Sequence, residues 1–170
     1  MAKEIILTQS KVAVVDNIDF EWLNQWKWYA AHRKTKSGDL WYAVREIHPD
    51  TCVLMHRIIA KRACLPPAEH YDHKDHDGLN NRRSNLRPAT RTQNLGNQRK
   101  TANRSSSFKG VSWDESRNRW RAQICIENRR RFLGRFSKEE DAADAYAIAA
   151  HELFGEFTNT TLDRPFKEKA

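Results

Sequence analysis

The sequence predicts an α+β protein with two folded units, and three observations support this fold class. Short runs of β-branched and aromatic residues recur along the chain, which is typical of strands. Residues 54–63 and the segment from residue 137 onward instead carry apolar side chains at helical spacing. A polar stretch at residues 99–107 has no apolar periodicity and reads as a linker. We therefore expect a mixed N-terminal unit and a C-terminal unit with one helix.

The N-terminal unit is predicted to begin with short strands and one short helix. Residues 11–15 are rich in valine, and a capping-type residue, Asp19, precedes spaced apolar positions. Residues 28–30 and 41–44 read as strands on either side of a turn at 36–39. Four of the six tryptophans fall in this half, where they indicate a small aromatic core. Base stacking by one of them is the alternative.

The C-terminal unit is predicted to be a three-stranded antiparallel sheet packed on one helix. The strands are expected at residues 111–113, 120–126 and 131–136. A helix should follow from Ser137, because Ser137 and Glu140 form a capping box, and Gly155 should end it. Its apolar stripe consists of Ala142, Tyr146, Ala149, Ala150 and Leu153.

Charge is unevenly distributed in this chain of 170 residues, whose formal net charge is +8. Residues 99–135 hold 11 Lys/Arg against 3 Asp/Glu, whereas residues 137–156 hold 1 against 6. This segregation favours one basic face and a polyanionic partner. No apolar run is long enough to span a bilayer, and the N-terminus lacks a signal peptide, so we expect a cytoplasmic protein that binds no membrane. The three cysteines form no C-x-x-C pair and should be buried free thiols.

Residues 71–87 carry the side chains that phosphodiester hydrolysis needs. A histidine can deprotonate water, and a divalent ion can stabilise the developing charge. Asp72 and His73 are adjacent, so on an extended chain they point in opposite directions. Asn94 follows a second capping box, Thr90-x-x-Gln93, and should lie on a short helix. The order strand, loop, strand, helix would allow one residue to bind metal while another faces the phosphate.

This pattern of Asp72-His73, Asn85-Leu86-Arg87 and Asn94 resembles the ββα-metal motif of HNH endonucleases, closest to the phage-borne homing enzymes. The resemblance implies that His73 is the general base and that Asp72 and Asn94 bind one Mg²⁺ or Mn²⁺. It also implies that Asn85 braces the loop and holds His73 in orientation. Arg87 is assigned to DNA contact.

Asn94 stands where many relatives have histidine, and an amide oxygen suits a hard cation. Relatives with this variant tend to cut one strand, so the resemblance implies a site-selective nickase. His56 either lines the site or is a structural histidine of its helix. His70 and His76 flank the motif, but their spacing fits no standard zinc site.

Alternation along the strand at 119–124 predicts a DNA-binding face in the C-terminal unit. Arg119, Arg121 and Gln123 share one side, and the apolar residues between them face the helix. A β-ribbon can enter the major groove, where Arg pairs with guanine and Gln with adenine.

Residues 108–157 resemble an Apetala-two domain of the ethylene-response-factor type, on the motifs at 108–113, 120–124, 132–136 and 141–146. The chain departs from that pattern at Ser112, Asp114 and Cys125. The resemblance implies that the residues facing DNA are Lys109, Arg119, Arg121, Gln123, Arg130 and Phe132.

We therefore expect a nuclease domain at 1–100, a linker at 101–107, a DNA-binding domain at 108–160 and a tail at 161–170, acting as a monomer on double-stranded DNA. A catalytically silent DNA-binding regulator and an RNA-binding protein are the alternative hypotheses. The basic face offers few aromatic side chains for stacking on single-stranded bases, which counts against the RNA hypothesis.

Overall fold

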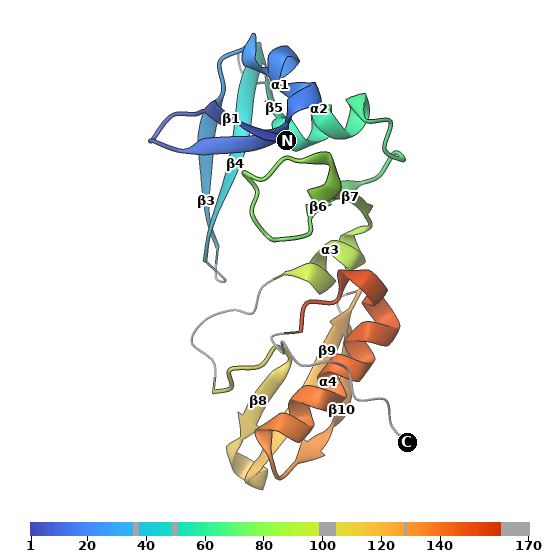
Figure 1. The fold of residues 1–170 in the computed structure, drawn as a ribbon. Helices are drawn as coiled ribbons and strands as arrows, with labels where there is room; N and C mark the ends of the chain where they lie inside the picture. Colours follow the sequence, from blue (N-terminus) through green and yellow to red (C-terminus); the bar gives the residue numbers. More distant parts are fainter. Residues whose placement is uncertain (36–37, 49–50, 99–104, 128, 161–170) are drawn as a thin grey trace. The chain divides into compact units, whose positions relative to one another are not determined.

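A computed structural model describes residues 1–35, 38–48, 51–98, 105–127 and 129–160. The chain divides into two compact units, Met1–Arg91 and Thr92–Ala170, and each is described by itself (Figure 1). Both units combine helices with antiparallel strand pairs, which confirms the predicted α+β class. None of the helices in the described ranges is long and apolar enough to cross a membrane.

The first unit is built from small antiparallel sheets and two short helices. β1 pairs with β2, strands β3, β4 and β5 form a three-stranded sheet in that order, and β6 pairs with β7. Its elements are β1 (Ala2–Ile6), β2 (Val12–Asp16), α1 (Asn17–Asn24), β3 (Tyr29–Thr35), β4 (Gly38–His48), β5 (Thr51–Leu54), α2 (Met55–Arg62), β6 (His70–His73), the 3₁₀ turn η1 (Arg83–Asn85) and β7 (Leu86–Ala89).

These elements confirm the predicted strands of the N-terminal half, with one shift in the first helix. α1 begins at Asn17, so Asp19 lies inside its first turn and is fully buried rather than capping it. The hairpin predicted at 36–39 is present, with Thr35 opposite Gly38, although residues 36 and 37 lie outside the described ranges.

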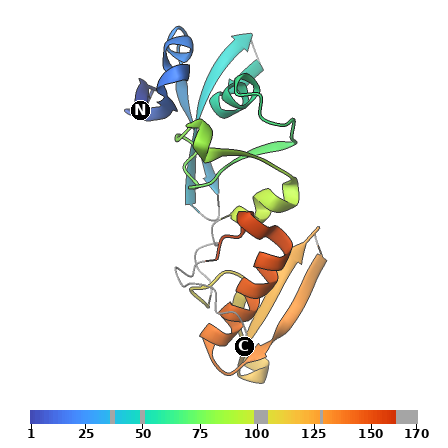
Figure 2. The same cartoon turned by 45° about the vertical axis from the view of Figure 1, so that its right-hand side comes forward.

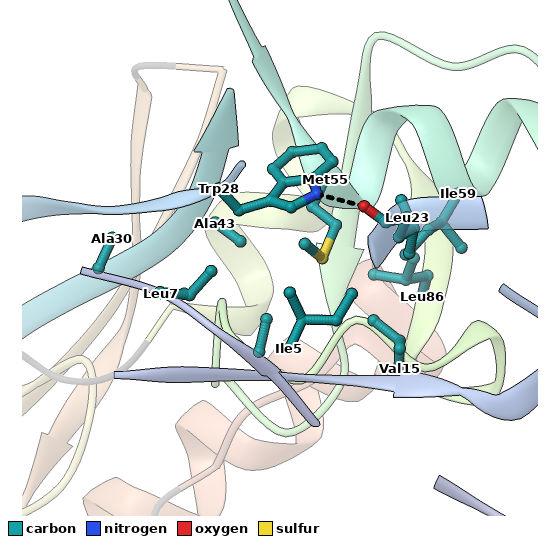
Figure 3. Packing of buried hydrophobic residues seen from close by; sticks show 11 residues of the cluster. Ile5, Leu7, Val15, Leu23, Trp28, Ala30, Ala43, Met55, Ile59 and Leu86 are labelled. Atoms are coloured by element: carbon teal, nitrogen blue, oxygen red, sulfur yellow. Dashed lines mark hydrogen bonds between the residues drawn. The ribbon is translucent and has the colours of Figure 1, made fainter. Parts of the chain in front are cut away.

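The core of the first unit draws on almost every element. Trp28 is buried, and its indole N–H donates to the carbonyl oxygen of Leu23 at 2.9 Å (Figure 3). The other three tryptophans of this half, partly buried, pack against the same cluster, which confirms the predicted aromatic core. The buried cluster consists of Ile5, Leu7, Ala13, Val15, Leu23, Trp28, Ala30, Ala43, Met55, Ile59 and Leu86. Because β1, β2 and β7 all contribute to it, the N-terminal hairpin is part of the same folded unit as the predicted catalytic strands.

A buried carboxylate joins α1 to the segment before β7. Asp19 accepts two hydrogen bonds from the Arg83 guanidinium, both at 2.7 Å, and Arg62 approaches it at 3.3 Å. One residue before α1, the Asp16 carboxylate accepts a hydrogen bond from the Arg83 backbone N–H at 2.8 Å. Arg83 is thus held through both its side chain and its backbone.

The second unit is the predicted three-stranded sheet with one helix. The strand order is β10-β9-β8, all antiparallel, and α4 lies along one face of this sheet (Figures 1 and 2). Buried alanines of β9 and α4 make this contact close, with Ala122 and Ala142 fully buried. Its elements are α3 (Arg91–Asn97), which starts at the boundary, β8 (Val111–Asp114), η2 (Glu115–Arg117), β9 (Arg119–Ile126), β10 (Arg129–Phe136), α4 (Glu139–Phe154) and η3 (Gly155–Phe157).

Two details of α4 were predicted incorrectly. The helix begins at Glu139 without a side-chain cap, so the capping box of Ser137 and Glu140 is absent. The Glu139 carboxylate instead accepts hydrogen bonds from the Ser106 hydroxyl at 2.7 Å and the Ser107 backbone N–H at 3.0 Å, which folds these two residues, placed in the linker by the sequence, onto the helix start.

At the other end of α4, the predicted stripe residue Leu153 is 37% exposed, whereas Phe154 is 6% exposed. Phe154 points inward instead, because its ring packs over Gly96 of α3. A Cβ added at Gly96 would come within 2.6 Å of this ring. Gly155, with a φ of +53°, ends the helix as predicted.

The contacts of α3 therefore lie with the C-terminal sheet and helix. The Lys109 ammonium donates to the carbonyl oxygens of Gly96 and Gln98, both at 2.7 Å. The Asn159 side chain donates to the Asn97 carbonyl oxygen at 3.0 Å. These bonds satisfy carbonyl groups at the C-terminal end of α3 that have no partner within the helix.

The three cysteines are free, as predicted, but all are exposed, contrary to the prediction of burial. Cys125 illustrates the reason, because it lies on the sheet face opposite α4, one position beyond the buried Ile124.

Replacing Arg83 by Ala should destabilise the first unit by about 3 kcal/mol, because a buried carboxylate loses its two-bonded partner. Chemical denaturation measures this change in the free energy of unfolding. Arg82→Ala is the matched control, since Arg82 is exposed and adjacent, and it should change stability little. Equal effects of the two substitutions would contradict a structural role for the Asp19–Arg83 pair.

Candidate functional site

The predicted catalytic residues lie on a short antiparallel pair of strands. β6 and β7 align Asp72 with Arg87 and His73 with Leu86, and residues 74–82 followed by η1 connect them. Asp72 and His73 are both buried, and Asp72 contacts Arg87 whereas His73 contacts Asn81. This agrees with the prediction that adjacent residues on an extended chain face opposite ways.

Asp72 is held by its cross-strand neighbour. The Nε and a terminal nitrogen of Arg87 both donate to Oδ2 of Asp72 at 3.0 Å. Arg87, assigned to DNA contact by the sequence, is 8% exposed, so the structure gives it a protein partner in this buried pair. The contact with DNA stays a prediction. The guanidinium balances the charge of a carboxylate that would otherwise be costly to bury.

The side chain of Asn81 faces the His73 ring. The distance from His73 Nε2 to Asn81 Oδ1 is 3.4 Å. The Asn81 amide is oriented by a second bond, from its Nδ2 to the Leu79 carbonyl oxygen at 3.0 Å. Because Nδ2 is the donor to Leu79, the Asn81 atom that faces the ring is the acceptor Oδ1, which accepts a hydrogen bond when Nε2 of His73 carries the proton.

Burial lowers the pKa of His73, while the hydrogen bond with Asn81 and the nearby carboxylate of Asp75 act in the opposite direction. A lowered pKa keeps the imidazole neutral near neutral pH. In the neutral ring with its proton on Nε2, Nδ1 is the basic nitrogen.

Two further aromatic side chains surround the His73 ring. His56 on α2 meets it edge to face at 5.0 Å between ring centroids, and Tyr42 on β4 lies 6.1 Å from it. Burial, followed by the neighbouring His73 and Arg57, lowers the pKa of His56 to about 3. This position beside the His73 ring agrees with the hypothesis that His56 lines the site. Tyr42 was missed, and no local motif marks it, because β4 is far from β6 in the chain.

Asn85 braces the loop, as the resemblance implied. Its amide nitrogen donates to Oδ1 of Asp75 at 2.9 Å and to the Asn80 carbonyl oxygen at 2.7 Å, and its Oδ1 accepts from the Asp75 backbone N–H at 3.2 Å. The Asn81 side chain also contacts His73, and the role of Asn85 in orienting His73 stays a prediction. Sequence reasoning did not assign that role to Asn81, because its neighbour Asn80 offers the same side chain.

Asn94 lies on α3, in the second unit. The donor chemistry of the predicted ligands fits a hard cation, since Asp72 supplies carboxylate oxygen and Asn94 an amide oxygen. Among the residues that the structure describes, no three His, Cys, Asp or Glu side chains lie close enough together to hold a metal ion.

The exposed face of the C-terminal sheet gathers most of the predicted DNA contacts. In the antiparallel register, Gln123 lies opposite Phe132, and Cys125 lies opposite Arg130. Directly opposed residues share a face, so both join Arg119 and Arg121 there. Phe132 is 54% exposed. Lys109 differs, because it precedes β8 and its ammonium donates to the carbonyl oxygens of α3.

The same face includes an acidic residue and a basic partner that sequence reasoning did not select. Arg135 donates to Asp114 Oδ2 at 3.0 Å, and its guanidinium lies 5.0 Å from the centroid of the Phe132 ring. A hydrogen bond from the Ser116 hydroxyl, followed by Arg135, lowers the pKa of Asp114. Asp114 is therefore an ionised group whose charge is balanced locally.

Comparison with known families agrees with both halves of this description. The family model for HNH endonuclease matches residues 53–95, and the model for the AP2 domain matches residues 106–156. The first match covers β5 through most of α3, and the second covers the sheet and α4. No solved structure matches the chain.

Two relatives each match the chain over 93 residues. One relative is a protein of Acanthamoeba polyphaga mimivirus described as an uncharacterized HNH endonuclease. It is 40% identical over 93 residues, which is 55% of this chain and 47% of the relative. Protein 3.8 of Escherichia phage T7 is 30% identical over 93 residues, which is 55% of this chain and 76% of the relative. The chain thus spans about half the length of the mimivirus protein.

These matches define the class: an HNH-type protein with an appended DNA-binding module. The chain belongs to the HNH endonuclease family, and it carries an AP2 domain at its C-terminal side.

Acidification should destabilise the first unit partly through His56. Its pKa is about 3 in the folded state and near 6.5 in the unfolded chain, so the unfolded state binds the proton first. The contribution of the neutral His56 ring to the free energy of unfolding is complete above pH 6.5. It is lost as the pH falls toward 3, at about 1.4 kcal/mol per pH unit. Denaturant unfolding at several pH values measures it.

The non-titrating variant His56→Phe should show a smaller loss of stability between pH 6.5 and 3 than the wild type. His48→Gln, at an exposed position on β4, should follow the wild-type profile. If His56→Phe loses stability as steeply as wild type, the burial of a neutral His56 is not the cause.

Proposed function

We propose that this protein is a metal-dependent DNA endonuclease that nicks one strand at selected sites, as homing-type enzymes do. The observation that carries the proposal is the pair of buried side chains at the end of β6. A neutral His73, hydrogen-bonded through Nε2, stands next to the carboxylate of Asp72. An imidazole kept neutral by burial is in the state that a general base requires.

In the proposed reaction, Nδ1 of His73 takes a proton from water as the water oxygen attacks phosphorus. A new oxygen–phosphorus bond forms, the bond to the 3′ oxygen breaks, and that oxygen acquires a proton from solvent. The products are a 5′ phosphate and a 3′ hydroxyl. Asn85 contributes by bracing the loop that follows β6, through its bonds to Asp75 and Asn80.

Asp72 and Asn94 are the proposed ligands for one Mg²⁺ or Mn²⁺. When bound, such an ion supplies electrostatic stabilisation of the charge that develops on the phosphate and the leaving oxygen. The hydrogen bonds from Arg87 to a single oxygen of Asp72 limit the rotation of this carboxylate and orient it for that task.

The AP2 sheet is proposed to bind the major groove of double-stranded DNA, with the protein acting as a monomer. Arg119, Arg121 and Gln123 would read base edges, while Arg130 and Phe132 extend the same face. Arg87 and Lys109 remain assigned to DNA by the sequence, and such contacts would need them to exchange their present partners.

The second candidate is a DNA-binding regulator whose nuclease motif is silent. The surroundings of His73 favour the endonuclease hypothesis over the silent regulator. A histidine with no catalytic role would need neither an acceptor facing Nε2 nor a buried carboxylate beside it.

Replacing His73 by Ala should reduce plasmid nicking by at least about 100-fold, in line with the loss of a general base. Conversion of supercoiled plasmid to open circles, with Mg²⁺ or Mn²⁺ and with EDTA, is the measurement. The wild type should produce open circles before linear DNA, and EDTA should stop the reaction.

Because the target sequence is unknown, the substrates should include a library of plasmids. Wild-type protein that leaves every plasmid intact with both metals would favour the silent regulator, and nicking that persists in the His73→Ala variant would remove His73 from the mechanism.

Replacing Arg130 by Ala should weaken DNA binding at every sequence and reduce the slope of log K against log salt by about 1, the value for one phosphate contact. Fluorescence anisotropy over a range of salt concentrations measures the slope. Lys138→Ala, an exposed position before α4, is the control that should keep the wild-type slope. Equal slopes for all three proteins would exclude Arg130 from the interface.

A further inference from the structure

The loop after β6 is anchored on the N-terminal hairpin. The backbone N–H of Val14 on β2 donates to the Leu79 carbonyl oxygen at 2.9 Å, and the backbone N–H of Asn81 donates to the Val14 carbonyl oxygen at 2.7 Å. These two bonds make a short parallel bridge between Val14 of β2 and Asn80 of the loop. Asn81 follows directly and is 1% exposed.

Two residues further on, the same loop is anchored a second time. The Asp16 carboxylate accepts the Arg83 backbone N–H, and Asp19 holds the Arg83 side chain. Residues 79–83 are thus fixed to β2 and α1 at both ends, and Asn81 belongs to the first anchor through its backbone N–H.

The Asn81 side chain uses both ends of its amide. Its nitrogen donates to Leu79, and its oxygen faces Nε2 of His73. Other side chains of this kind in the same region are bonded elsewhere. The Asn85 amide, for example, donates to the Asp75 carboxylate. A purely structural filler would not need an acceptor aimed at the imidazole, since an apolar side chain could occupy the same space.

We propose that Asn81 is a positioning residue, which fixes the tautomer and orientation of His73, and that the N-terminal hairpin serves to hold Asn81 in place. This inference rests on the proposed role of His73 as general base. The chemistry is direct: an acceptor on Nε2 keeps the ring proton there, so Nδ1 remains the nitrogen that receives a proton from water. The chain of support runs from Val14 through Asn81 to His73.

On this proposal, the first 24 residues contribute to the reaction by holding the loop that carries Asn81. β1 and β2 place side chains in the core, and α1 provides Asp19, but the backbone of Val14 reaches the catalytic loop itself. A change in the hairpin would therefore be transmitted to His73 through one hydrogen-bonded residue.

The tautomer of His73 tests the proposal without any DNA or metal. Long-range ¹H–¹⁵N correlation spectra of the full chain at pH 8 distinguish a proton on Nε2 from one on Nδ1. Wild-type His73 should carry it on Nε2. Asn81→Ala should give a mixture of both tautomers, Asn81→Asp should keep the wild-type form because an acceptor remains, and the neighbouring control Asn80→Ala should keep it too.

Hydrogen exchange measured on the same protein tests the anchor. The Asn81 backbone amide should exchange much more slowly than exposed loop amides, because it donates to Val14. Fast exchange at Asn81 would overturn the role of the hairpin.

Kinetics then separates positioning from folding. Asn81→Ala should lower kcat in plasmid nicking about 10- to 100-fold with little change in KM, the size of effect found for groups that orient a reacting residue. In a His73→Ala background, Asn81→Ala should have no further effect.

Failure of this inference is distinguishable from failure of the proposed function. A wild-type His73 with its proton on Nδ1 overturns the positioning role even if Asn81→Ala does not fold. Nicking that survives His73→Ala overturns the proposed mechanism. A correct wild-type tautomer with full kcat in Asn81→Ala shows that the hydrogen bond exists but does not position the base.

Discussion

The ion pair between Asp19 and Arg83 is the constraint on which the first unit depends. A carboxylate with no exposure to solvent must have cationic partners, and the guanidinium meets it with two hydrogen bonds of 2.7 Å. This requirement fixes where α1 lies relative to the turn before β7. β2, which leads directly into α1, is then placed where Val14 reaches the loop at Leu79 and Asn81. The site at the end of β6 is thus organised from the N-terminal residues as well as from its own strands.

Burial and charge are balanced in the site by two different means. Asp72 forms an ion pair with Arg87 across the strand pair, whereas His56 and His73 are held neutral because burial lowers the pKa of both. The result is one carboxylate of fixed orientation beside one uncharged base. On the AP2 sheet, by contrast, exposed arginines remain in solvent, and the charge of Asp114 is balanced by Arg135.

The sequence was informative where a local pattern reports a local structure. Alternation along β9 placed Ala122 and Ile124 inside, and family resemblance selected Asp72, His73 and Asn85. Errors arose where a distant segment decides the outcome. Phe154 rather than Leu153 turns inward because Gly96 lies beneath it, and Glu139 bonds Ser106 instead of completing a capping box. Tyr42 could not be foreseen for the same reason, because it comes from β4, which is distant in the chain. His56 was among the sequence candidates, whereas Asn81 could not be distinguished from its neighbour Asn80 by sequence alone. The positions of Asp72 and Asn94 as metal ligands, and the DNA contacts of the sheet, remain predictions.

The attachment of α3 to the C-terminal unit has a consequence for how such proteins could be recombined. The two family matches leave residues 96–105 between them, which suggests a convenient joint for exchanging one DNA-binding module for another. A joint placed there would cut between α3 and the groups that receive it, Lys109, Phe154 and Asn159. A transplanted module would lack its own α3, against which these three side chains pack or form hydrogen bonds. Exchange between family members is therefore better tolerated when the crossover lies before α3, near the boundary at Arg91, so that the helix travels with the sheet.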